Sequence, residues 1–227
     1  MNVLGLAKNS RKLKKLIITS TSEVYGTAEY VPIDENHRIN AQSPYAATKV
    51  AADQLALSFH KSFGVPVTVV RPFNTFGPRQ SLRAVIPTII NQFINFNGYI
   101  EIGETKSTRD FTYVEELAEG FYRTMINKNN IGSLYNIGSN FEISIEELIG
   151  LISEILDIKD YKIKVKKLKL RPKDSEVYRL WCDNSLCKKI LKWSPKYNSL
   201  QRFKEPLSKT INWYKNNNLN IINTNHI

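Results

Sequence analysis

Tyr45 and Lys49 form the pair of side chains whose types and spacing most directly suggest chemistry. Residues four apart share one face of a helix, and an ammonium group near a phenol stabilises the phenolate. In that arrangement Tyr45 could accept a proton from a substrate hydroxyl. The alternative is a solvated lysine beside a tyrosine that anchors the helix, because a chain this rich in tyrosine and lysine contains such a pair by chance.

Thr21 and Glu23 are a second pair with useful side chains, and they follow the apolar run Leu16–Thr19. A hydroxyl can orient a substrate oxygen, and a carboxylate can remove an acidified proton from carbon. The plainer alternatives are a β-branched residue that ends a strand and a surface carboxylate on a loop. The spacing of Thr21 to Tyr45 favours the functional interpretation.

Three predicted elements would position these side chains. Leu16–Thr19 is typical of a buried strand, and Ser43–His60 predicts a helix with Ser43 as its cap and a proline in its first turn. Gly64 ends that helix, and Val65–Val70 predicts a β-branched strand. A strand, a helix and a strand at short spacing indicate an α/β fold with a doubly wound parallel sheet.

The rest of the chain continues the α/β pattern. Ser144 with Glu147 three residues later predicts a capping box. The Asn-rich tail, residues 216–225, is expected to fray. Helices are predicted at Val85–Phe96, Val114–Ile126, Ser144–Leu156, Asn184–Lys192 and Leu207–Lys215, and strands at Tyr99–Ile102, Leu134–Ile137 and Lys162–Leu168.

The composition argues against several function classes. The net charge of +11 is spread over Arg11–Lys15, Lys159–Lys173 and Lys188–Lys192 rather than one stripe, so we expect neither nucleic acid nor a membrane as partner. No apolar run reaches the ~20 residues of a membrane span, and the start is apolar before it is basic, unlike a secretion signal. We expect a cytoplasmic enzyme. Cys182 and Cys187 lack the spacing of a zinc site, which predicts no metal and two inert thiols.

The glycines present a difficulty for dinucleotide binding. A doubly wound sheet that binds a dinucleotide carries a glycine-rich turn between its first strand and helix, where the pyrophosphate meets the helix N-terminus. None of the 10 glycines has that spacing, and only the segment 1–15 precedes the first predicted strand. Either the chain does not bind a dinucleotide, or it begins partway through such a fold.

Three segments, in this order and spacing, decide between these options: TSTSEVYG (19–26), SPYAATK (43–49) and RPFNTFGPR (71–79). They resemble the extended short-chain dehydrogenase/reductases that act on nucleotide sugars. The resemblance continues through TRDFTYV (108–114), LYNIG (134–138), RPKD (171–174), WCDNS (181–185) and LKW (191–193). GSNFEIS (138–144) and SEVYRLWCDN (175–184) look most like the UDP-N-acetylglucosamine 4,6-dehydratases of legionaminic-acid synthesis.

The resemblance implies a role for each matching residue. The catalytic set would be Thr21, Glu23, Tyr45 and Lys49, with Glu23 removing the C5 proton after C4 has become a ketone. NAD would be bound by Thr19, Ser20, Tyr45, Lys49 and Pro72. The substrate's nucleotide diphosphate would be held by Asn74, Arg79, Arg109, Arg171 and Asp174, of which Arg79 is the weaker candidate because it follows Pro78 in a turn.

The implied reaction is NAD-dependent 4,6-dehydration of a nucleotide sugar, with UDP-N-acetylglucosamine as the favoured substrate. Many dehydratases place an aspartate before the glutamate, whereas this chain has Ser22. The string TSEVYG also resembles UDP-glucuronate decarboxylases, and a nucleotide-sugar 4-epimerase is a further alternative. An alternative of another class is a non-catalytic remnant.

The resemblance also implies a domain organisation. Residues 1–77 would be the C-terminal part of a Rossmann-like sheet, residues 78–227 a smaller mixed α/β substrate domain, and residues 108–138 would cross back to the sheet. Family members begin roughly a hundred residues earlier with the glycine-rich half of the fold. We therefore expect an N-terminally truncated chain that is inactive alone and a homodimer in the full-length parent.

Overall fold

A parallel sheet of three strands forms one half of the computed structural model, which describes residues 1–166 and 177–217. The strands are β1 (Leu16–Thr19), β2 (Val67–Pro72) and β6 (Leu134–Ile137), and they lie in the order β1-β2-β6. Thr19 pairs with Val70, and Pro72 pairs with Ile137, so the carboxyl ends of all three strands meet at one edge. The predicted α/β fold class with a parallel sheet is confirmed.

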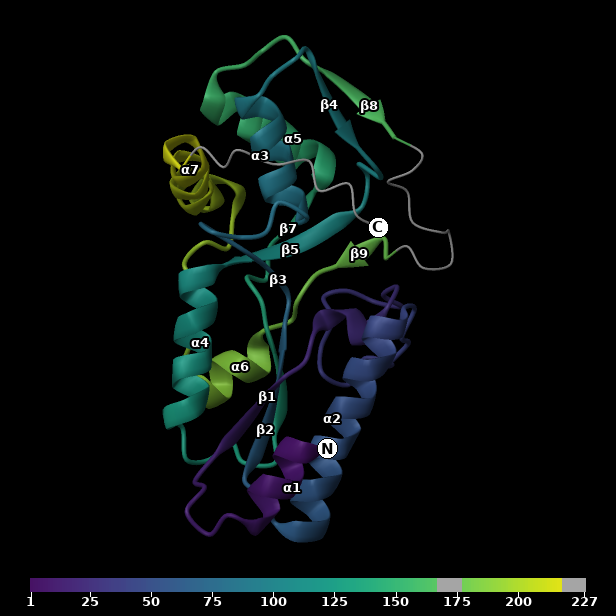
Figure 1. Cartoon of the computed structure of the whole chain (residues 1–227), viewed down its shortest axis with the longest axis vertical. Helices are drawn as coiled ribbons and strands as arrows, with labels where there is room; N and C mark the ends of the chain where they lie inside the picture. Colours follow the sequence, from purple (N-terminus) through teal and green to yellow (C-terminus); the bar gives the residue numbers. More distant parts are fainter. Residues whose placement is uncertain (167–176, 218–227) are drawn as a thin grey trace.

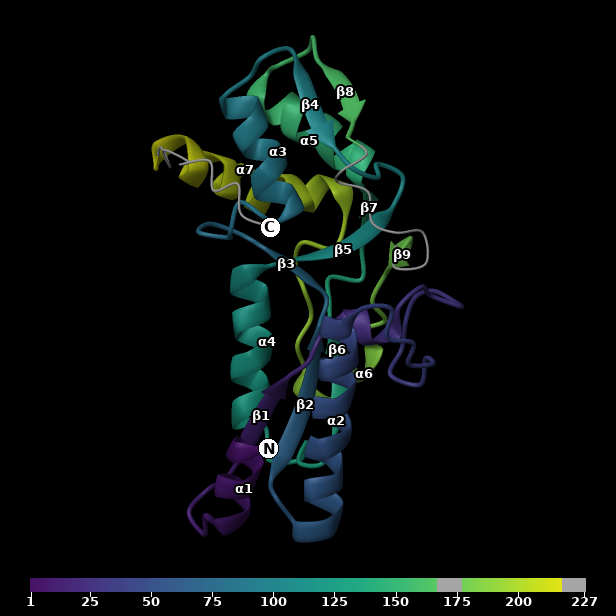
Figure 2. The ribbon, with the colours of Figure 1, turned by 45° about the vertical axis from the view of Figure 1, so that its right-hand side comes forward.

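Helices cover both faces of this sheet, which lies in the lower half of Figure 1. The helices α1 (Asn2–Asn9) and α2 (Pro44–Phe63) pack with Val67 and Val69 on one face. The helices α4 (Val114–Ile126) and α6 (Ser185–Leu191) pack with Val70 on the other, and Figure 2 shows the strands between α4 and α2. A parallel sheet covered on both faces needs continuously apolar strands, which explains the buried run at the start of β2.

The helix α2 has the ends that its sequence predicts. The Ser43 side chain caps it by accepting a hydrogen bond from the Ala46 amide at 3.1 Å, and Pro44 occupies the first turn. The helix ends at Gly64, whose φ of +67° lies in the left-handed region that favours glycine. It runs to Phe63 rather than to the predicted His60.

The other half of the molecule is a mixed α/β layer in the upper part of Figure 1. In its main sheet β5 (Thr108–Tyr113) pairs in parallel with β3 (Asn74–Phe76) and β9 (Arg179–Leu180), and antiparallel with β7 (Glu142–Ser144). A separate parallel pair joins β4 (Tyr99–Ile102) to β8 (Lys162–Val165). One apolar core unites this half with the helices α3 (Val85–Ile94), α5 (Ile145–Leu156) and α7 (Leu200–Asn216).

The chain passes between the two halves more than once. From β2 it continues directly into β3, and it returns through β5, α4 and β6. The strand β5 lies in the upper sheet, whereas β6 pairs with β2 in the lower one. The segment 108–138 therefore contributes to both halves.

Several boundaries differ from the prediction. The last helix begins at Leu200 instead of Leu207, because Pro206 lies buried inside it rather than at its start. The strands β3, β5, β7 and β9 were not predicted as elements. The strand predicted for 162–168 ends at Val165, and residues 167–168 and most of the Asn-rich tail lie outside the described residues.

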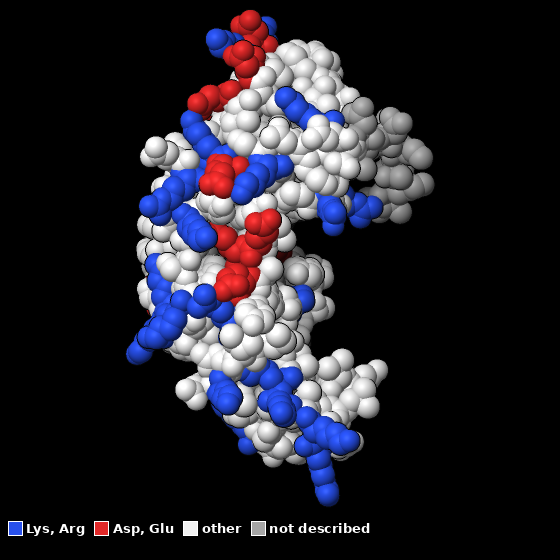
Figure 3. Space-filling view, turned by 90° about the vertical axis from the view of Figure 1, so that its left-hand side faces the viewer, with Lys and Arg blue, Asp and Glu red and all other residues white. Residues whose placement is uncertain are grey.

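The charged side chains do not gather into one stripe on the face drawn in Figure 3, where an acidic group interrupts the basic side chains. Within the described ranges no helix is long and apolar enough to cross a membrane, and no group of His, Cys, Asp and Glu side chains could hold a metal ion. Cys182 and Cys187 are buried free thiols, and burial raises the pKa of both.

Candidate active site

Tyr45 and Lys49 lie in the first two turns of α2, beside the carboxyl end of β1. The Lys49 ammonium donates a hydrogen bond to the Thr19 carbonyl at 2.9 Å, and Nζ lies 5.8 Å from the centroid of the Tyr45 ring. Tyr45 is 51% exposed, so a ligand can reach the residue. Ligands of doubly wound sheets bind outside the carboxyl ends of the strands, and the pair lies at that edge.

Thr21 and Glu23 belong to a short 3-10 helix, η1 (Ser22–Tyr25), that continues from β1. Thr21 is its N-cap, and the Thr21 hydroxyl accepts a hydrogen bond from the Glu23 amide at 3.3 Å. Val24 and Tyr25 are fully buried, whereas Glu23 stays partly exposed. Gly26 closes the turn with φ +63°, and a Cβ there would lie 2.2 Å from the Asn40 carbonyl oxygen, so this close approach requires glycine.

Two polar side chains at the same edge have a buried oxygen without a hydrogen-bond partner among the described residues. They are Ser20, through Oγ, and Asn74, through Oδ1. Ser20 follows β1, where its amide donates to the Val70 carbonyl at 2.7 Å, and Asn74 begins β3 just after Pro72. Buried polar atoms are normally satisfied, so these two atoms mark a place where a ligand could bind.

The residues expected to hold a diphosphate are only partly brought together. Asn74 pairs with Phe111 on the neighbouring strand β5, two residues from Arg109, whose Nη1 donates to the Thr108 carbonyl at 2.8 Å. Arg79 is exposed in the turn after β3, with φ +66°, a conformation unusual for a residue with a side chain. Arg171 and Asp174 lie outside the described residues.

A buried network beneath α2 was not predicted. Arg71 Nε donates to Asp53 Oδ2 at 2.9 Å, with exposed side-chain fractions of 2% and 0%. Arg71 Nη1 donates to the Tyr25 hydroxyl at 2.9 Å, and that hydroxyl donates to Asn136 Oδ1 at 2.7 Å. Burial raises the pKa of Tyr25 to about 12, although Arg71 opposes the shift. One feature of the sequence could have drawn attention to Asp53: it follows Lys49 by four residues and therefore lies on the same face of the helix.

Asp110 is a second buried acid that the sequence did not reveal. Its carboxylate accepts hydrogen bonds from the Ser139 amide at 2.7 Å, the Ser139 hydroxyl at 2.6 Å, the Asn140 amide at 2.9 Å and the Cys182 amide at 3.2 Å. Burial raises the pKa of Asp110 to about 6, and these four donors oppose the shift. The carboxylate thus joins β5, next to Arg109, to the loops that contain Ser139 and Cys182.

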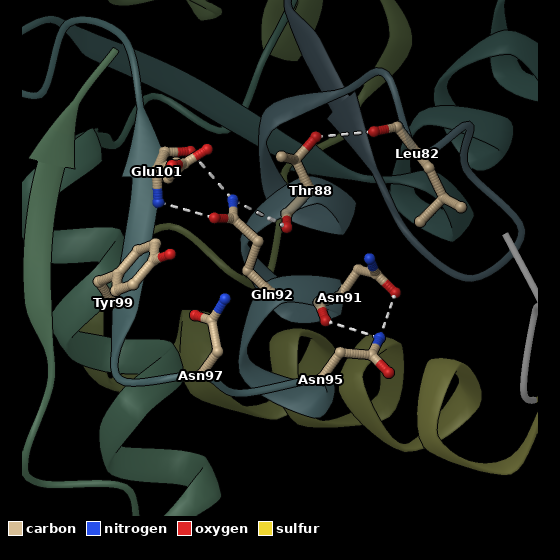
Figure 4. Close-up of a pocket in the computed structure, with 8 residues that line it drawn as sticks. All are labelled: Leu82, Thr88, Asn91, Gln92, Asn95, Asn97, Tyr99 and Glu101. Carbon is tan, nitrogen blue, oxygen red and sulfur yellow. Dashed lines mark hydrogen bonds between the residues drawn. The ribbon is translucent and has the colours of Figure 1, made fainter. Parts of the chain in front are cut away.

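A cavity of about 420 Å³ is lined by residues of α3, β4 and the segments next to them, and the residues described above are not among them (Figure 4). Half of its eight lining residues have amide side chains, and several of these are hydrogen-bonded to neighbouring residues of the cavity. Gln92 accepts from the Glu101 amide at 2.7 Å and donates to the Glu101 carbonyl at 3.1 Å, and Asn95 donates to Asn91 at 3.1 Å. None of the predicted catalytic or binding residues that the structure describes lines this cavity.

Comparisons with known proteins show which families of enzymes the chain resembles. The family model described as GDP-mannose 4,6 dehydratase matches residues 1–205. Human dTDP-D-glucose 4,6-dehydratase is 33% identical over 222 residues, which cover 95% of this chain and 61% of the human protein. UDP-glucuronic acid decarboxylase 1 of Arabidopsis thaliana is 32% identical over 228 residues, covering 97% of this chain and 49% of that protein.

Solved structures give the same picture. The UDP-glucuronic acid 4-epimerase of Bacillus cereus, solved in complex with UDP-glucuronic acid and NAD, superimposes with a TM-score of 0.84 at 29% identity. The match covers 94% of this chain and 65% of the epimerase chain. The chain thus spans about half to two thirds of the length of these relatives.

Proposed function

This chain belongs to the GDP-mannose 4,6 dehydratase family, whose members include nucleotide-sugar dehydratases, epimerases and decarboxylases, and we propose that it carries the catalytic residues of an NAD-dependent nucleotide-sugar 4,6-dehydratase. The observation that supports this most directly is the hydrogen bond from Lys49 to the Thr19 carbonyl. It holds the Tyr45–Lys49 face of α2 against the strand end that continues into Thr21 and Glu23. The four side chains proposed for the reaction therefore share one edge of the sheet.

In the first step Tyr45 takes the proton from the C4 hydroxyl of the sugar. Lys49, 5.8 Å from the tyrosine ring centroid, stabilises the phenolate that does this. Thr21 donates its hydroxyl hydrogen to the same sugar oxygen and orients it toward Tyr45. Its oxygen accepts from the Glu23 amide, which leaves the hydroxyl hydrogen available.

Glu23 then removes the C5 proton, which the C4 ketone has acidified, and water is lost across C5 and C6. General acid–base assistance of this kind contributes on the order of 10²–10⁴-fold. The preceding residue, Ser22, is 3% exposed and carries no acidic group for the departing hydroxyl. Decarboxylation of a C4-keto sugar acid releases carbon dioxide and needs no such acid. Because Ser22 offers no such acid, UDP-glucuronate decarboxylation is the second candidate function.

The residues at the strand ends fit the nicotinamide end of NAD. Ser20 offers a buried oxygen that has no hydrogen-bond partner among the described residues, and Lys49 and Tyr45 offer the ammonium and hydroxyl that a ribose diol can bind. When bound, NAD supplies the hydride chemistry, accepting a hydride from C4 of the sugar and returning it to C6. Thr19, Ser20 and Pro72 would line its site at the carboxyl ends of β1 and β2.

The nucleotide diphosphate would be held by arginines, because a planar guanidinium donates two parallel hydrogen bonds to phosphate oxygens. Arg109 on β5 and Arg79 in the turn after β3 are the described candidates, together with Asn74. UDP-N-acetylglucosamine is the proposed sugar nucleotide, on the resemblance of residues 138–144 and 175–184. A homodimer through α1 and α2 is proposed on the general resemblance to the family, and Val3 and Leu6 on α1 are 57% and 74% exposed.

Mass spectrometry of the products tests the proposal. The chain, and a fusion that supplies a glycine-rich segment before Met1, are incubated with NAD and a panel of UDP-, dTDP- and GDP-sugars. The expected product is UDP-N-acetylglucosamine lighter by one water. Unchanged mass with inverted C4 would indicate an epimerase, and carbon dioxide from UDP-glucuronate a decarboxylase. A folded fusion that acts on no sugar would support the non-catalytic alternative.

A further inference from the structure

Three functional groups follow one another along a single face of α2 at intervals of four residues. They are the phenol of Tyr45, the ammonium of Lys49 and the carboxylate of Asp53. Residues four apart on a helix can touch, so Lys49 can reach the carboxylate on one side as readily as the phenol on the other. In the structure its ammonium lies on the Thr19 carbonyl, and the carboxylate is held by Arg71 from β2.

The Asp53 carboxylate would attract a cation strongly if Arg71 did not hold it. The side chain is fully buried, and its second oxygen, Oδ1, has no hydrogen-bond partner among the described residues. A buried charge without a partner is costly, so it draws in whatever cation can reach it. The charged residues on the elements packed against α2 are Glu23 on η1, Arg71 on β2 and Lys8 on α1, and Lys8 lies over the Phe63 ring at the far end of the helix. Without Arg71, the cation within reach is Lys49.

We propose that Arg71 is a positioning residue that keeps Lys49 available to Tyr45 by holding the Asp53 carboxylate. This inference rests on the proposed function of the Tyr45–Lys49 pair. It assigns opposite roles to the two partners of one buried ion pair. Asp53 is a competitor for the Lys49 ammonium, and Arg71 is the group that suppresses the competition.

The ionisation of Tyr45 reports on where the Lys49 ammonium lies. We would follow the ¹³Cζ signals of labelled tyrosines against pH in the 227-residue chain, with Tyr45→Phe to assign the signal. Lys49→Met removes the ammonium altogether, so the Tyr45 midpoint in this variant is the reference for complete loss of the lysine from its position.

The variants at the ion pair have opposite expected results. Arg71→Met should raise the Tyr45 midpoint as far as Lys49→Met does, because the freed carboxylate takes the ammonium. Asp53→Asn should leave the midpoint unchanged, and the double variant Asp53→Asn/Arg71→Met should restore the wild-type value. A network that merely supports the fold predicts instead that Asp53→Asn also shifts the midpoint, because either single variant then leaves one buried charge of the pair without its partner.

Two further results keep the test decisive. Asp53→Asn preserves shape and an acceptor for Arg71, so it should fold even where Arg71→Met does not, and a raised Tyr45 midpoint in Asp53→Asn would overturn the inference. An unchanged midpoint in folded Arg71→Met would overturn it as well. If Lys49→Met itself leaves the midpoint unchanged, the Tyr45–Lys49 pair of the proposed function fails first, and the inference fails with it. None of these readouts requires turnover.

Discussion

Tyr25→Phe tests whether the buried network holds the 3-10 helix that carries Glu23. The Tyr25 hydroxyl is protonated at neutral pH, because burial raises its pKa to about 12, and it has two partners, Arg71 and Asn136. Its removal leaves an arginine N–H and the Asn136 Oδ1 oxygen buried and unpaired. Each such group costs about 1–3 kcal/mol, but the Phe ring keeps the contact with the Arg71 guanidinium, so we expect a loss of about 2–4 kcal/mol in the free energy of unfolding.

Urea and thermal unfolding followed by circular dichroism measure this loss. For a chain of this size it corresponds to a melting temperature lower by roughly 4–16 °C. The matched control is Tyr122→Phe, which removes a hydroxyl from a side chain that is 53% exposed and should change the free energy by less than about 0.5 kcal/mol.

A second measurement locates the effect. The Gly26 amide, which donates to the Glu23 carbonyl at 3.2 Å, and the Asn40 amide, which donates to Val24 at 2.9 Å, should exchange hydrogen faster in Tyr25→Phe. Stability equal to that of Tyr122→Phe, or unchanged exchange at these two amides, would refute the argument that the network fixes this turn.

Four further outcomes are expected. In the fusion that carries a glycine-rich segment before Met1, here called the complemented enzyme, Tyr45→Phe should lower turnover by orders of magnitude and leave sugar-nucleotide affinity nearly intact. Near-normal turnover would rule out the role of Tyr45 as base. Glu23→Gln should still reduce NAD on addition of substrate but should exchange no solvent deuterium into C5 and lose no water; normal product would remove Glu23 from the mechanism. The 227 residues alone should bind NAD at least about a thousandfold more weakly than a complemented enzyme, because no glycine has the spacing of a pyrophosphate-binding turn, and micromolar binding by calorimetry would contradict this. Folding raises the pKa of Asp110 to about 6, so the folded chain holds that proton more tightly than the unfolded chain, and stability should fall by up to about 3 kcal/mol as pH rises from about 4 to about 6, a dependence that Asp110→Asn should abolish in unfolding experiments.

The elements that the sequence predicted well are those whose ends are decided locally. The capping box of Ser144 and Glu147 forms as expected, with the Glu147 amide donating to the Ser144 hydroxyl at 3.1 Å. The boundaries of α4 are those predicted, and α2 begins and ends at the residues that cap it. In each case a few neighbouring residues contain the whole signal.

The missed elements depend on partners far away in the chain. The strands β3, β7 and β9 are two or three residues long, and each exists because it pairs with β5. No local pattern specifies such a pairing. The network under α2 was not predicted for the same reason. Tyr25 and Asn136 are 111 positions apart in the sequence, and Arg71 and Asp53 are 18 apart.

Few residues decide which reaction follows the proposed oxidation of C4. Dehydratase, decarboxylase and epimerase all need a hydroxyl base with its ammonium and an orienting hydroxyl, which Tyr45, Lys49 and Thr21 can supply. The three reactions differ in what happens after C4 has become a ketone. In the proposed function, the residues of the 3-10 helix η1 determine that step. In the proposed function Glu23 would be the base for C5, which an epimerase does not require, whereas the buried Ser22 offers no acid for the C6 hydroxyl. In a dehydratase built this way Glu23, once it has taken the C5 proton, would be the acid for the departing hydroxyl. Solvent would then supply the proton that C5 receives as the hydride returns to C6.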